Sequence, residues 1–592
     1  MTQIKERLEL LRQAMKKAGV SACIIPGTDP HAGEYISDYW KERIWISGFT
    51  GSAGTAVVTM DKAGLWTDSR YFLQGANQLS GSGIELMKQG LTDTLDIIPW
   101  LSIVLKPGEK VAVNPQLFSV NAYANMKAEL KMSGIDLVSI DLLKEVWTDR
   151  PALPDKPFFI FDTKYSGKTI SEKLALVRGE LKKLHANVFV LSALDEIAWL
   201  FNIRGNDVAF NPLVISYALV EEDKATLFVS AVKCTAASKV YIEKNGVIVA
   251  EYGDIYKKLN EISEEKTVLI DGNKLNQSLY EAIPAACEKR IAMSPVSKLK
   301  SRKNEVEIAG YRRAMIKDGV ALTKFYMWLE EHVKTGKLTE VSIAEKLRDF
   351  RAEQKNFIGE SFDTIAGYAG HGAIVHYSAT PESASTLKPE GILLLDSGGQ
   401  YLDGTTDITR TITLGKPTAK QKKDYTIVLK GHIDLAMAKY PENTRGSQID
   451  ILARKAMWDS GINYGHGTGH GVGHFLNVHE GPQSIRMEEN PNTLQLGMVM
   501  SNEPGIYRTN EYGMRTENVV LIVAAEKSEF GQFYKFETLT LCFIDTKLID
   551  KSMLNKHEEK WLNNYHKTVY KKLSPFLTDD EKKWLKKKCK EI

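Results

Sequence analysis

The chain has 592 residues, of which 77 are basic and 74 acidic, and its formal net charge is +3. Such a balanced charge provides no strong positive field, so binding to nucleic acid is not expected. Apolar residues make up 43% of the chain and charged residues 26%, as is typical of globular proteins. The length is enough for about three or four domains.

The beginning of the chain predicts an amphipathic helix with Ile4, Leu8, Leu11 and Met15 on one face. This segment lacks the apolar core of a signal peptide. No later segment has about 18 consecutive apolar residues, so we expect no association with membranes. The five cysteines are scattered and form no CxxC pair, which argues against a disulfide framework and against a thiolate metal site. A reducing cytoplasm is therefore the expected location.

The first half of the chain resembles two copies of one unit. Residues 11–29 align with residues 177–195, and each segment predicts the end of a helix with a basic face followed by a short apolar strand. A segment rich in aromatic residues and ending in glycine follows in both copies, WISGFTG from Trp45 and WLFNIRG from Trp199. The alternative is a coincidence between two ordinary βα units, which are common. We favour a duplicated α/β domain because the two copies keep similar patterns at a similar offset.

Two segments predict domain boundaries. The first, TDRPALPDKP at residues 148–157, has three prolines in ten residues, as suits a linker. The second precedes Asn304 and Glu307, a pair that predicts a capping box at the start of a long helix. Residues 552–592 are basic and predict more helices, whose lysines we expect to form a solvated face rather than a site for acidic partners. The expected domains are residues 1–155, residues 156–302, and residues 303–592 with a helical C-terminal extension.

Two aspartates of the third domain are expected to lie on adjacent strands. ILLL predicts a buried strand that ends at Asp396, YLDG a turn, and TTDITRTIT a half-buried strand that contains Asp407. In an antiparallel hairpin the two carboxylates can point the same way. Taken alone, Asp396 is better explained as a turn residue and Asp407 as an exposed strand residue.

Two glutamates adjoin strongly apolar segments further along the chain. Glu503 ends the segment MVMSNE, and Glu517 precedes the apolar strand NVVLIV. Buried carboxylates must share protons, pair with cations or bind metal, because an unpaired buried charge is very costly. Arg410 and Arg515 are available for pairing. Four acids near one histidine-rich loop nevertheless indicate a dinuclear metal site, because four carboxylates roughly balance two divalent cations.

The histidine-rich loop, GHGTGHGVGHFLNVHEGP, contains His466, His470, His474 and His479. Its glycines resemble a phosphate-binding loop, but a dinucleotide site also requires a following helix, and HFLNVHEGP is not a helix pattern. A zincin site requires a helical HExxH, which the glycines and the missing glutamate exclude. The residues alone leave open how many of the four histidines bind metal.

Five residues resemble, in order and spacing, the metal ligands of the pita-bread metallopeptidases: Asp396, Asp407, His470, Glu503 and Glu517. Over essentially its whole length, the chain is similar to the three-domain, cytosolic Xaa-Pro aminopeptidase family (aminopeptidase P). The resemblance is carried by FTGSAGTAVV, LWTDSRYFLQ and NIRGNDVAFNP in the first two domains, and by HYSAT and DGTTDITRT in the third. It implies two creatinase-N-like α/β domains followed by a C-terminal pita-bread catalytic domain.

The resemblance implies two metal positions that share ligands. One would be formed by Asp407, His470, Glu503 and Glu517, and the other by Asp396, Asp407 and Glu517. The oxygen-rich ligand set suits Mn²⁺, although Co²⁺ or Zn²⁺ can occupy such a site. Glu503 would also take the proton of the attacking water and deliver it to the departing proline nitrogen.

The resemblance also implies residues that handle the substrate. His376 and His479 would contact the scissile carbonyl and stabilise the oxyanion. His466 would line the proline pocket. The implied catalytic set is His376, His479 and Glu503, and the implied substrate-binding set is Arg70, His376, His466, His470, His479, Tyr507 and Arg515. His371 and His474 receive no role, and we expect both to be structural.

The implied activity is removal of the N-terminal residue from peptides with proline in second position, by a metal-bridged hydroxide that attacks the Xaa-Pro carbonyl. Prolidase, methionine aminopeptidase and a non-catalytic peptide-binding protein are the alternatives. Methionine aminopeptidases lack the two N-terminal domains, prolidases commonly have one, and non-catalytic members typically lose ligands. The implied partners are peptides with an Xaa-Pro N-terminus and a second copy of the chain in a homodimer.

Overall fold

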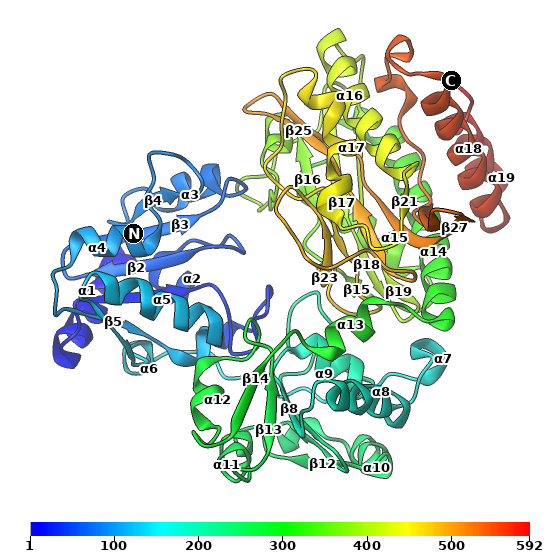
Figure 1. Cartoon of the computed structure of the whole chain (residues 1–592). Helices are drawn as coiled ribbons and strands as arrows, with labels where there is room; N and C mark the ends of the chain where they lie inside the picture. Colours follow the sequence, from blue (N-terminus) through cyan, green and yellow to red (C-terminus); the bar gives the residue numbers. More distant parts are fainter. Residues whose placement is uncertain (1) are drawn as a thin grey trace. The chain divides into compact units, whose positions relative to one another are not determined.

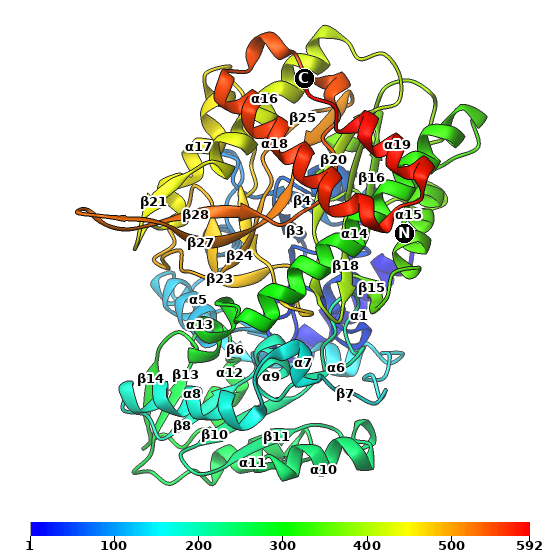
Figure 2. The ribbon, with the colours of Figure 1, turned by 90° about the vertical axis from the view of Figure 1, so that its right-hand side faces the viewer.

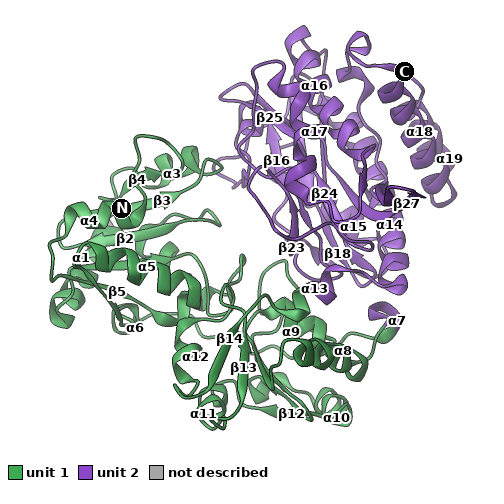
Figure 3. Cartoon of the chain, in the orientation of Figure 1, with its two compact units in different colours: residues 1–163, 168–297 green, residues 164–167, 298–592 purple. Residues whose placement is uncertain are grey.

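The computed structural model describes residues 2–592 and divides the chain into two compact units (Figures 1 and 3). Unit 1 comprises residues 1–163 and 168–297, and unit 2 comprises residues 164–167 and 298–592. The second boundary falls inside the short helix α13 (Pro295–Ser301). Within the described part of the chain, no helix combines the length and the apolar character needed to cross a lipid bilayer.

Unit 1 begins with a six-stranded sheet in the order β4-β3-β2-β1-β5-β6. Its strands are β1 (Ala22–Pro26), β2 (Thr55–Thr59), β3 (Ala63–Thr67), β4 (Glu85–Lys88), β5 (Lys110–Val113) and β6 (Asp136–Ser139). Strand β2 is antiparallel to β1 and β3, and the other neighbouring strands are parallel. The accompanying helices are α1 (Thr2–Ala18), α2 (Glu42–Ser47), α3 (Phe72–Gln78), α4 (Ile97–Val104), α5 (Val120–Met132) and α6 (Leu143–Val146).

A second six-stranded sheet repeats this topology in the order β12-β11-β10-β8-β13-β14. Its strands are β8 (Val188–Leu191), β10 (Tyr217–Glu221), β11 (Ala225–Phe228), β12 (Val247–Ala250), β13 (Thr267–Ile270) and β14 (Glu288–Ile291). The parallel and antiparallel pairings match those of the first sheet strand for strand, so the predicted duplication is confirmed. The other elements here are β7 (Phe159–Ile160), α8 (Ile170–Lys183), α9 (Leu194–Leu200), β9 (Ile203–Arg204), α10 (Ala236–Lys244), α11 (Asp254–Asn260) and α12 (Gln277–Ala282). The short helix α7 (Thr163–Ser166) falls mostly in unit 2.

The first helix forms as its apolar spacing predicts. In α1, the side chains of Leu8, Leu11 and Met15 are buried against the core of the first sheet, and Ile4 packs at its edge. Residues spaced three and four apart lie on one face of a helix, so burial of this face holds α1 to the sheet. All five cysteines are present as free thiols.

The first long helix of unit 2 is α14 (Glu305–His332). The predicted capping box is present: Asn304 Oδ1 accepts hydrogen bonds from the backbone of Val306 and Glu307, and the Glu307 carboxylate accepts one from the Asn304 N–H. The other helices are α15 (Glu340–Ala352), α16 (Ala419–Ala436), α17 (Gly446–Trp458), α18 (Lys556–Leu573) and α19 (Asp579–Lys588). In the predicted C-terminal extension, Lys588 of α19 contacts Glu330 of α14.

Two sheets form the centre of unit 2. The larger has the order β21-β28-β27-β24-β22-β23 and the smaller has the order β16-β17-β20. The strands of the larger sheet are β21 (Lys439–Pro441), β22 (Gly469–Gly471), β23 (Glu480–Ile485), β24 (Val499–Asn502), β27 (Asn518–Ser528) and β28 (Gly531–Thr538). Those of the smaller sheet are β16 (Ile365–Tyr368), β17 (Ile392–Ser397) and β20 (Ile408–Thr413). Strands β27 and β28 continue as a long two-stranded ribbon (Figure 2).

Two small sheets complete unit 2. One has three strands, β15 (Phe357–Glu360), β18 (Gly399–Tyr401) and β19 (Gly404–Thr405), and the other pairs β25 (Gly505–Arg508) with β26 (Tyr512–Arg515). Strands β18 and β19 form a tight turn inside the predicted hairpin, whose main strands β17 and β20 pair as expected. Strand β20 is not half-buried as predicted, because all six of its residues are buried. Its polar side chains are hydrogen-bonded in the interior, which satisfies them without solvent.

Candidate metal centre

The hairpin β17–β20 brings two aspartates to the same region of unit 2. Asp396 lies near the end of β17 opposite Thr409, and Asp407 immediately precedes β20. Strand residues two apart point to the same face, so Asp407 shares a face with Thr409 and hence with Asp396. Both aspartates are buried, Asp407 with only 4% of its surface exposed. The single-residue explanation of Asp407 as an exposed strand residue is therefore wrong.

The larger sheet contributes three more predicted residues. His470 lies on β22, Glu503 directly follows β24, and Glu517 directly precedes β27. His470 Nε2 is 3.4 Å from Asp407 Oδ2 and 3.6 Å from Glu503 Oε1. The two sheets meet here, because the Glu517 N–H donates to the Thr409 carbonyl at 3.1 Å.

These side chains have the properties of a metal site. Asp407, His470 and Glu517 each offer one possible ligand atom, and these three atoms lie within 4.8 Å of one another. Asp396 Oδ1 is buried and has no hydrogen-bond partner, a costly state for a carboxylate oxygen unless a cation binds it. The donors are carboxylates and one imidazole, which bind divalent cations. The predicted residues therefore fit a metal group.

Three titratable groups of the site have raised pKa values, so each binds its proton more tightly than usual. Burial raises the pKa of Glu503 to about 7, with the charges of Asp407 and Asp396 adding to the effect, although His470 and Arg515 oppose it. Burial, together with the neighbouring carboxylates, also raises the pKa of Glu517 well above its usual value. Burial alone would lower the pKa of His470, but Asp407 and Glu503 outweigh it and raise that pKa to about 9. A bound cation would therefore displace protons from this cluster, because its positive charge favours the deprotonated ligands.

The orientation of His470 leaves one ring nitrogen for a metal. Its Nδ1 lies 2.9 Å from the carbonyl of Gly471, which can only accept, so Nδ1 carries the proton. Nε2 is then the ring atom that faces Asp407 and Glu503. Such a backbone hydrogen bond fixes both the tautomer and the ring plane of a histidine ligand.

A chain of hydrogen bonds leads from Asp396 to His466. Arg515 Nη2 donates to Asp396 Oδ2 at 2.5 Å, and Arg515 Nη1 donates to the Tyr507 hydroxyl at 2.7 Å. The Tyr507 hydroxyl lies 2.8 Å from His466 Nε2, and His466 Nδ1 lies 2.8 Å from the Gly467 carbonyl. A neutral His466 ring therefore donates through Nδ1 and accepts from Tyr507. Three predicted substrate-binding residues are thus linked to one predicted ligand.

The remaining predicted residues lie in three places. The ring of His479 is perpendicular to the ring of His470, with 4.4 Å between centroids. His376 lies in the segment after β16 and is partly exposed. Arg70 belongs to unit 1, where its guanidinium forms two 2.8 Å hydrogen bonds with Asp68.

The two histidines without an assigned role have structural surroundings. His371 Nδ1 lies 3.0 Å from both carboxylate oxygens of Glu340, which also accepts from Tyr377. His474 is buried with its ring 5.4 Å from the ring of Tyr311 in α14. These contacts favour the expectation that both histidines are structural.

Sequence reasoning missed Thr409 and misjudged Arg410. Thr409 Oγ1 donates to Glu517 Oε2 at 2.7 Å and accepts from Arg515 Nε at 3.0 Å, so it orders a predicted ligand and its counter-charge. The alternation of β20 gives a signal for this role, because Thr409 follows Asp407 by two residues. Arg410 points to the other face and donates to backbone carbonyls, including that of Glu517, rather than to the carboxylates.

Comparisons with known proteins define the class of this chain. Residues 309–524 match the model of metallopeptidase family M24, and residues 532–592 match the C-terminal region of that family. Residues 7–146 and 149–307 each match the creatinase/prolidase N-terminal domain. The chain is thus an M24 metallopeptidase domain preceded by two such domains, which confirms the predicted fold.

Relatives that align over nearly the whole chain identify the family within this class. Aminopeptidase P2 of Arabidopsis thaliana is 40% identical over 614 residues, covering 97% of this chain and 86% of the relative. Xaa-Pro aminopeptidase 1 of Dictyostelium discoideum is 41% identical over 614 residues, covering 100% and 97%. An X-prolyl aminopeptidase of Caenorhabditis elegans, a cytosolic enzyme with a di-nuclear active site, matches with a TM-score of 0.95, 36% identity and complete coverage of both chains. This chain belongs to the Xaa-Pro aminopeptidase P family, as the motifs predicted.

Proposed function

We propose that the protein is a metal-dependent aminopeptidase that removes the N-terminal residue from peptides with proline in second position. The observation that carries the proposal is the cluster of Asp407, His470 and Glu517, in which both carboxylates are buried, in a chain whose full-length relatives include named Xaa-Pro aminopeptidases. The remaining carboxylates, Asp396 and Glu503, adjoin this cluster. Two divalent cations would offset the four acids.

The five predicted ligands would hold the two metal ions in overlapping sets. The first set is Asp407, His470, Glu503 and Glu517, and the second is Asp396, Asp407 and Glu517. Mn²⁺ is the proposed ion because oxygen ligands predominate, with Co²⁺ and Zn²⁺ as substitutes. Bound metal would supply activation of water at neutral pH and polarisation of the peptide carbonyl.

The protein's own residues would move the proton and stabilise charge. Glu503, which lies 3.6 Å from His470 Nε2, would accept the proton of the attacking water and donate it to the proline nitrogen. His479, beside the ligand His470, would donate to the oxyanion, and His376 would assist. The proline nitrogen needs this proton to depart, because without it the nitrogen would leave as an amide anion, which is a poor leaving group.

Substrate recognition would use the residues that surround the cluster. Tyr507 holds His466 through a hydrogen bond, so the ring of His466 can form a fixed wall of the pocket for the proline side chain. Arg515 holds Tyr507 in turn, at 2.7 Å. Arg70 is proposed to bind substrate from the N-terminal part of the chain.

One substrate panel tests the proposal. The Mn²⁺-loaded protein should cleave an Xaa-Pro-Yaa tripeptide, and should do so faster than an Xaa-Ala-Yaa tripeptide or an Xaa-Pro dipeptide. Cleavage of the dipeptide alone would make the protein a prolidase. Binding of peptide without cleavage by the metal-loaded protein would make it a peptide-binding member of the family.

The setting of the enzyme is also a proposal. A cytoplasmic location is supported by the free cysteines and by the cytosolic relative. A homodimer is proposed with contacts from two apolar side chains two turns apart on α17, Trp458 with 44% and Ile451 with 39% of its surface exposed. Light scattering should give twice the monomer mass, and a lower mass for Trp458→Gln. The domain division at residues 155 and 302 remains a prediction, which limited proteolysis can test.

A further inference from the structure

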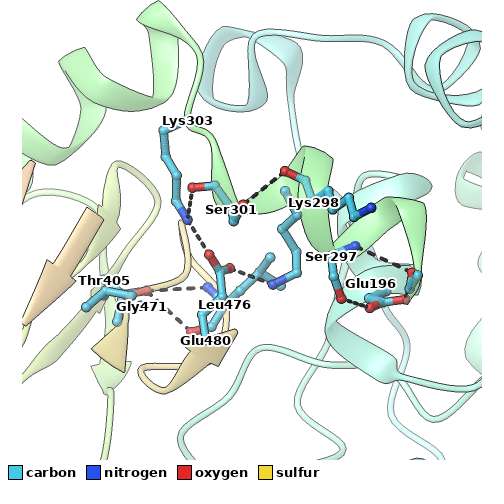
Figure 4. Close-up of polar contacts among 12 residues, drawn as sticks. Glu196, Ser297, Lys298, Ser301, Lys303, Thr405, Gly471, Leu476 and Glu480 are labelled. Atoms are coloured by element: carbon cyan, nitrogen blue, oxygen red, sulfur yellow. Dashed lines mark hydrogen bonds and ion pairs between the residues drawn. The ribbon is translucent and has the colours of Figure 1, made fainter. Parts of the chain in front are cut away.

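A buried cluster of charges lies at the start of β23, which directly follows His479 in the chain (Figure 4). Glu480, the next residue, has a fully buried carboxylate that contacts two lysines. Lys300 Nζ donates to Glu480 Oε2 at 2.6 Å, and Lys303 Nζ donates to Glu480 Oε1. Neither lysine side chain has more than 2% of its surface exposed. All three residues belong to unit 2.

The cluster has a rigid foundation on the lysine side. Lys303 lies between α13 and α14, and its backbone N–H donates to the Gly497 carbonyl at 2.9 Å. The neighbouring Arg302 forms a bridge with Met498, just before β24. Glu307, the capping residue of α14, adds a second carboxylate that faces Lys303. Two cations and two acids therefore balance one another in the interior, which lowers the cost of burying them.

The other side of the cluster is the start of β23. Glu480 is paired with Gly471 in the sheet, directly beside the predicted ligand His470. A Cβ on Gly471 would come within 2.5 Å of the Glu480 carbonyl, so glycine allows this close approach. The side chains of His479 and Glu480 contact different groups: the imidazole meets His470, and the carboxylate meets the lysines. Fixing Glu480 therefore fixes the backbone from which His479 projects.

We infer that Glu480, clamped by Lys300 and Lys303, is a positioning residue that sets the place of the His479 ring against the peptide carbonyl. The inference rests on the proposed function, because it gives His479 a substrate to act on. A carboxylate held by two buried cations resists displacement more than a neutral side chain does, since separating them would leave unpaired charges in the interior. A displacement of about 1 Å at a reacting group can slow a reaction roughly 100-fold.

The experiment is a double-mutant cycle between the clamp and His479. Glu480→Gln leaves two buried lysines with one acid and endangers folding, so the main variant is Glu480→Gln with Lys300→Met, which removes one charge of each sign. This double variant is compared with the wild type in the presence of His479 and after His479→Ala. For each protein, kcat and KM on an Xaa-Pro-Yaa tripeptide, bound Mn²⁺ per chain and the unfolding temperature are measured.

We expect the double variant to keep its metal and its KM within about threefold, and to lose about 10- to 100-fold in kcat. In the His479→Ala background the same two substitutions should change kcat less than twofold, because the ring they position is gone. Equal losses in both backgrounds, or a wild-type kcat in the double variant, would overturn the inference. Loss of metal in proportion to kcat would overturn it as well, because the cluster would then support the metal site rather than His479.

A matched control separates positioning from stability. Glu558 has a buried carboxylate that binds Lys430 at 2.7 Å, between α18 and α16. Glu558→Gln should lower the unfolding temperature and leave kcat per metal-loaded chain unchanged. A fall in kcat like that of the clamp variant would show that any lost buried ion pair has this effect. If the wild-type protein cleaves no Xaa-Pro peptide, the proposed function fails, whereas additive effects in an active enzyme reject only the clamp.

Discussion

Removal of the metal should make the stability of unit 2 depend on pH in a defined direction. In the metal-free protein the pKa of His470 is raised from 6.5 to about 9 by Asp407 and Glu503. A group that binds its proton more tightly in the folded state stabilises that state at low pH. This stabilisation is complete below about 6.5 and is lost as the pH rises through about 9. Glu503 acts in the same direction at lower pH, between about 4.5 and 7.

The magnitude follows from the shift. A shift of one pKa unit corresponds to about 1.4 kcal/mol. The titration of His470 alone should therefore lower the free energy of unfolding by about 3 kcal/mol between pH 6.5 and 9. Metal-loaded protein lacks this loss, because its ligands are deprotonated throughout. Metal binding should therefore stabilise the protein more at pH 9 than at pH 6.5, and should release on the order of two protons per chain near neutral pH.

The assay compares metal-free and Mn²⁺-loaded protein by urea unfolding at pH 6.5, 7.5, 8.5 and 9. The unfolding transition that responds to metal is followed, since only unit 2 carries the ligands. Taking the difference between the two forms cancels the titration of groups outside the site. His470→Asn serves as the control and should flatten the pH dependence of its metal-free form. A metal-free stability that stays level or rises relative to the loaded form across this range would refute the reasoning.

Five substitutions test other parts of the catalytic unit. His470→Ala should abolish bound metal and activity together, whereas His479→Ala should keep metal and lose about 100-fold or more in kcat; metal loss from His479→Ala would contradict the separation of roles. His474→Ala should leave both metal content and kcat nearly unchanged, and a large loss of kcat would give this histidine a catalytic role. Alanine favours helices, but Gly310→Ala should destabilise the protein by about 1–3 kcal/mol, because the added Cβ would lie 2.4 Å from the backbone carbonyl oxygen of Asp403. A raised unfolding temperature would contradict this. Thr409→Val should cost about 1–3 kcal/mol in unfolding free energy and weaken metal binding in calorimetry, because a buried hydrogen-bond network loses its centre; unchanged values would show that the network is dispensable.

The sequence alone predicted those features that depend on a few residues close together in the chain. Asn304 with Glu307 located the start of α14, because a capping box is a local interaction between neighbours. The strand and turn patterns around Asp396 and Asp407 predicted a hairpin, and the motifs predicted the family. The depth of burial of β20 was not predicted, because its alternating pattern is also that of a half-exposed strand. Only the packing of segments distant in sequence shows that Thr409 and Arg410 are satisfied in the interior.

Interactions between distant segments were also beyond the sequence. Glu480 and Lys300 are separated by 180 residues, and nothing local to either side chain indicates its partner. Arg515 was available to pair with an acid, and it donates to Asp396. The identity of this partner depends on how the two sheets pack against each other. The position of Arg70 relative to the metal site remains a prediction. Local chemistry can therefore nominate side chains, and the tertiary fold selects among them.

The division of the proposed ligands between two sheets has a consequence for when the chain can bind metal. Asp396 and Asp407 come from the smaller sheet, and His470, Glu503 and Glu517 come from the larger. A growing chain therefore cannot assemble this set of five before residue 517 has been synthesised and both sheets have docked. A chain truncated or misassembled before that point would lack part of the set, so bound metal would report a finished catalytic unit.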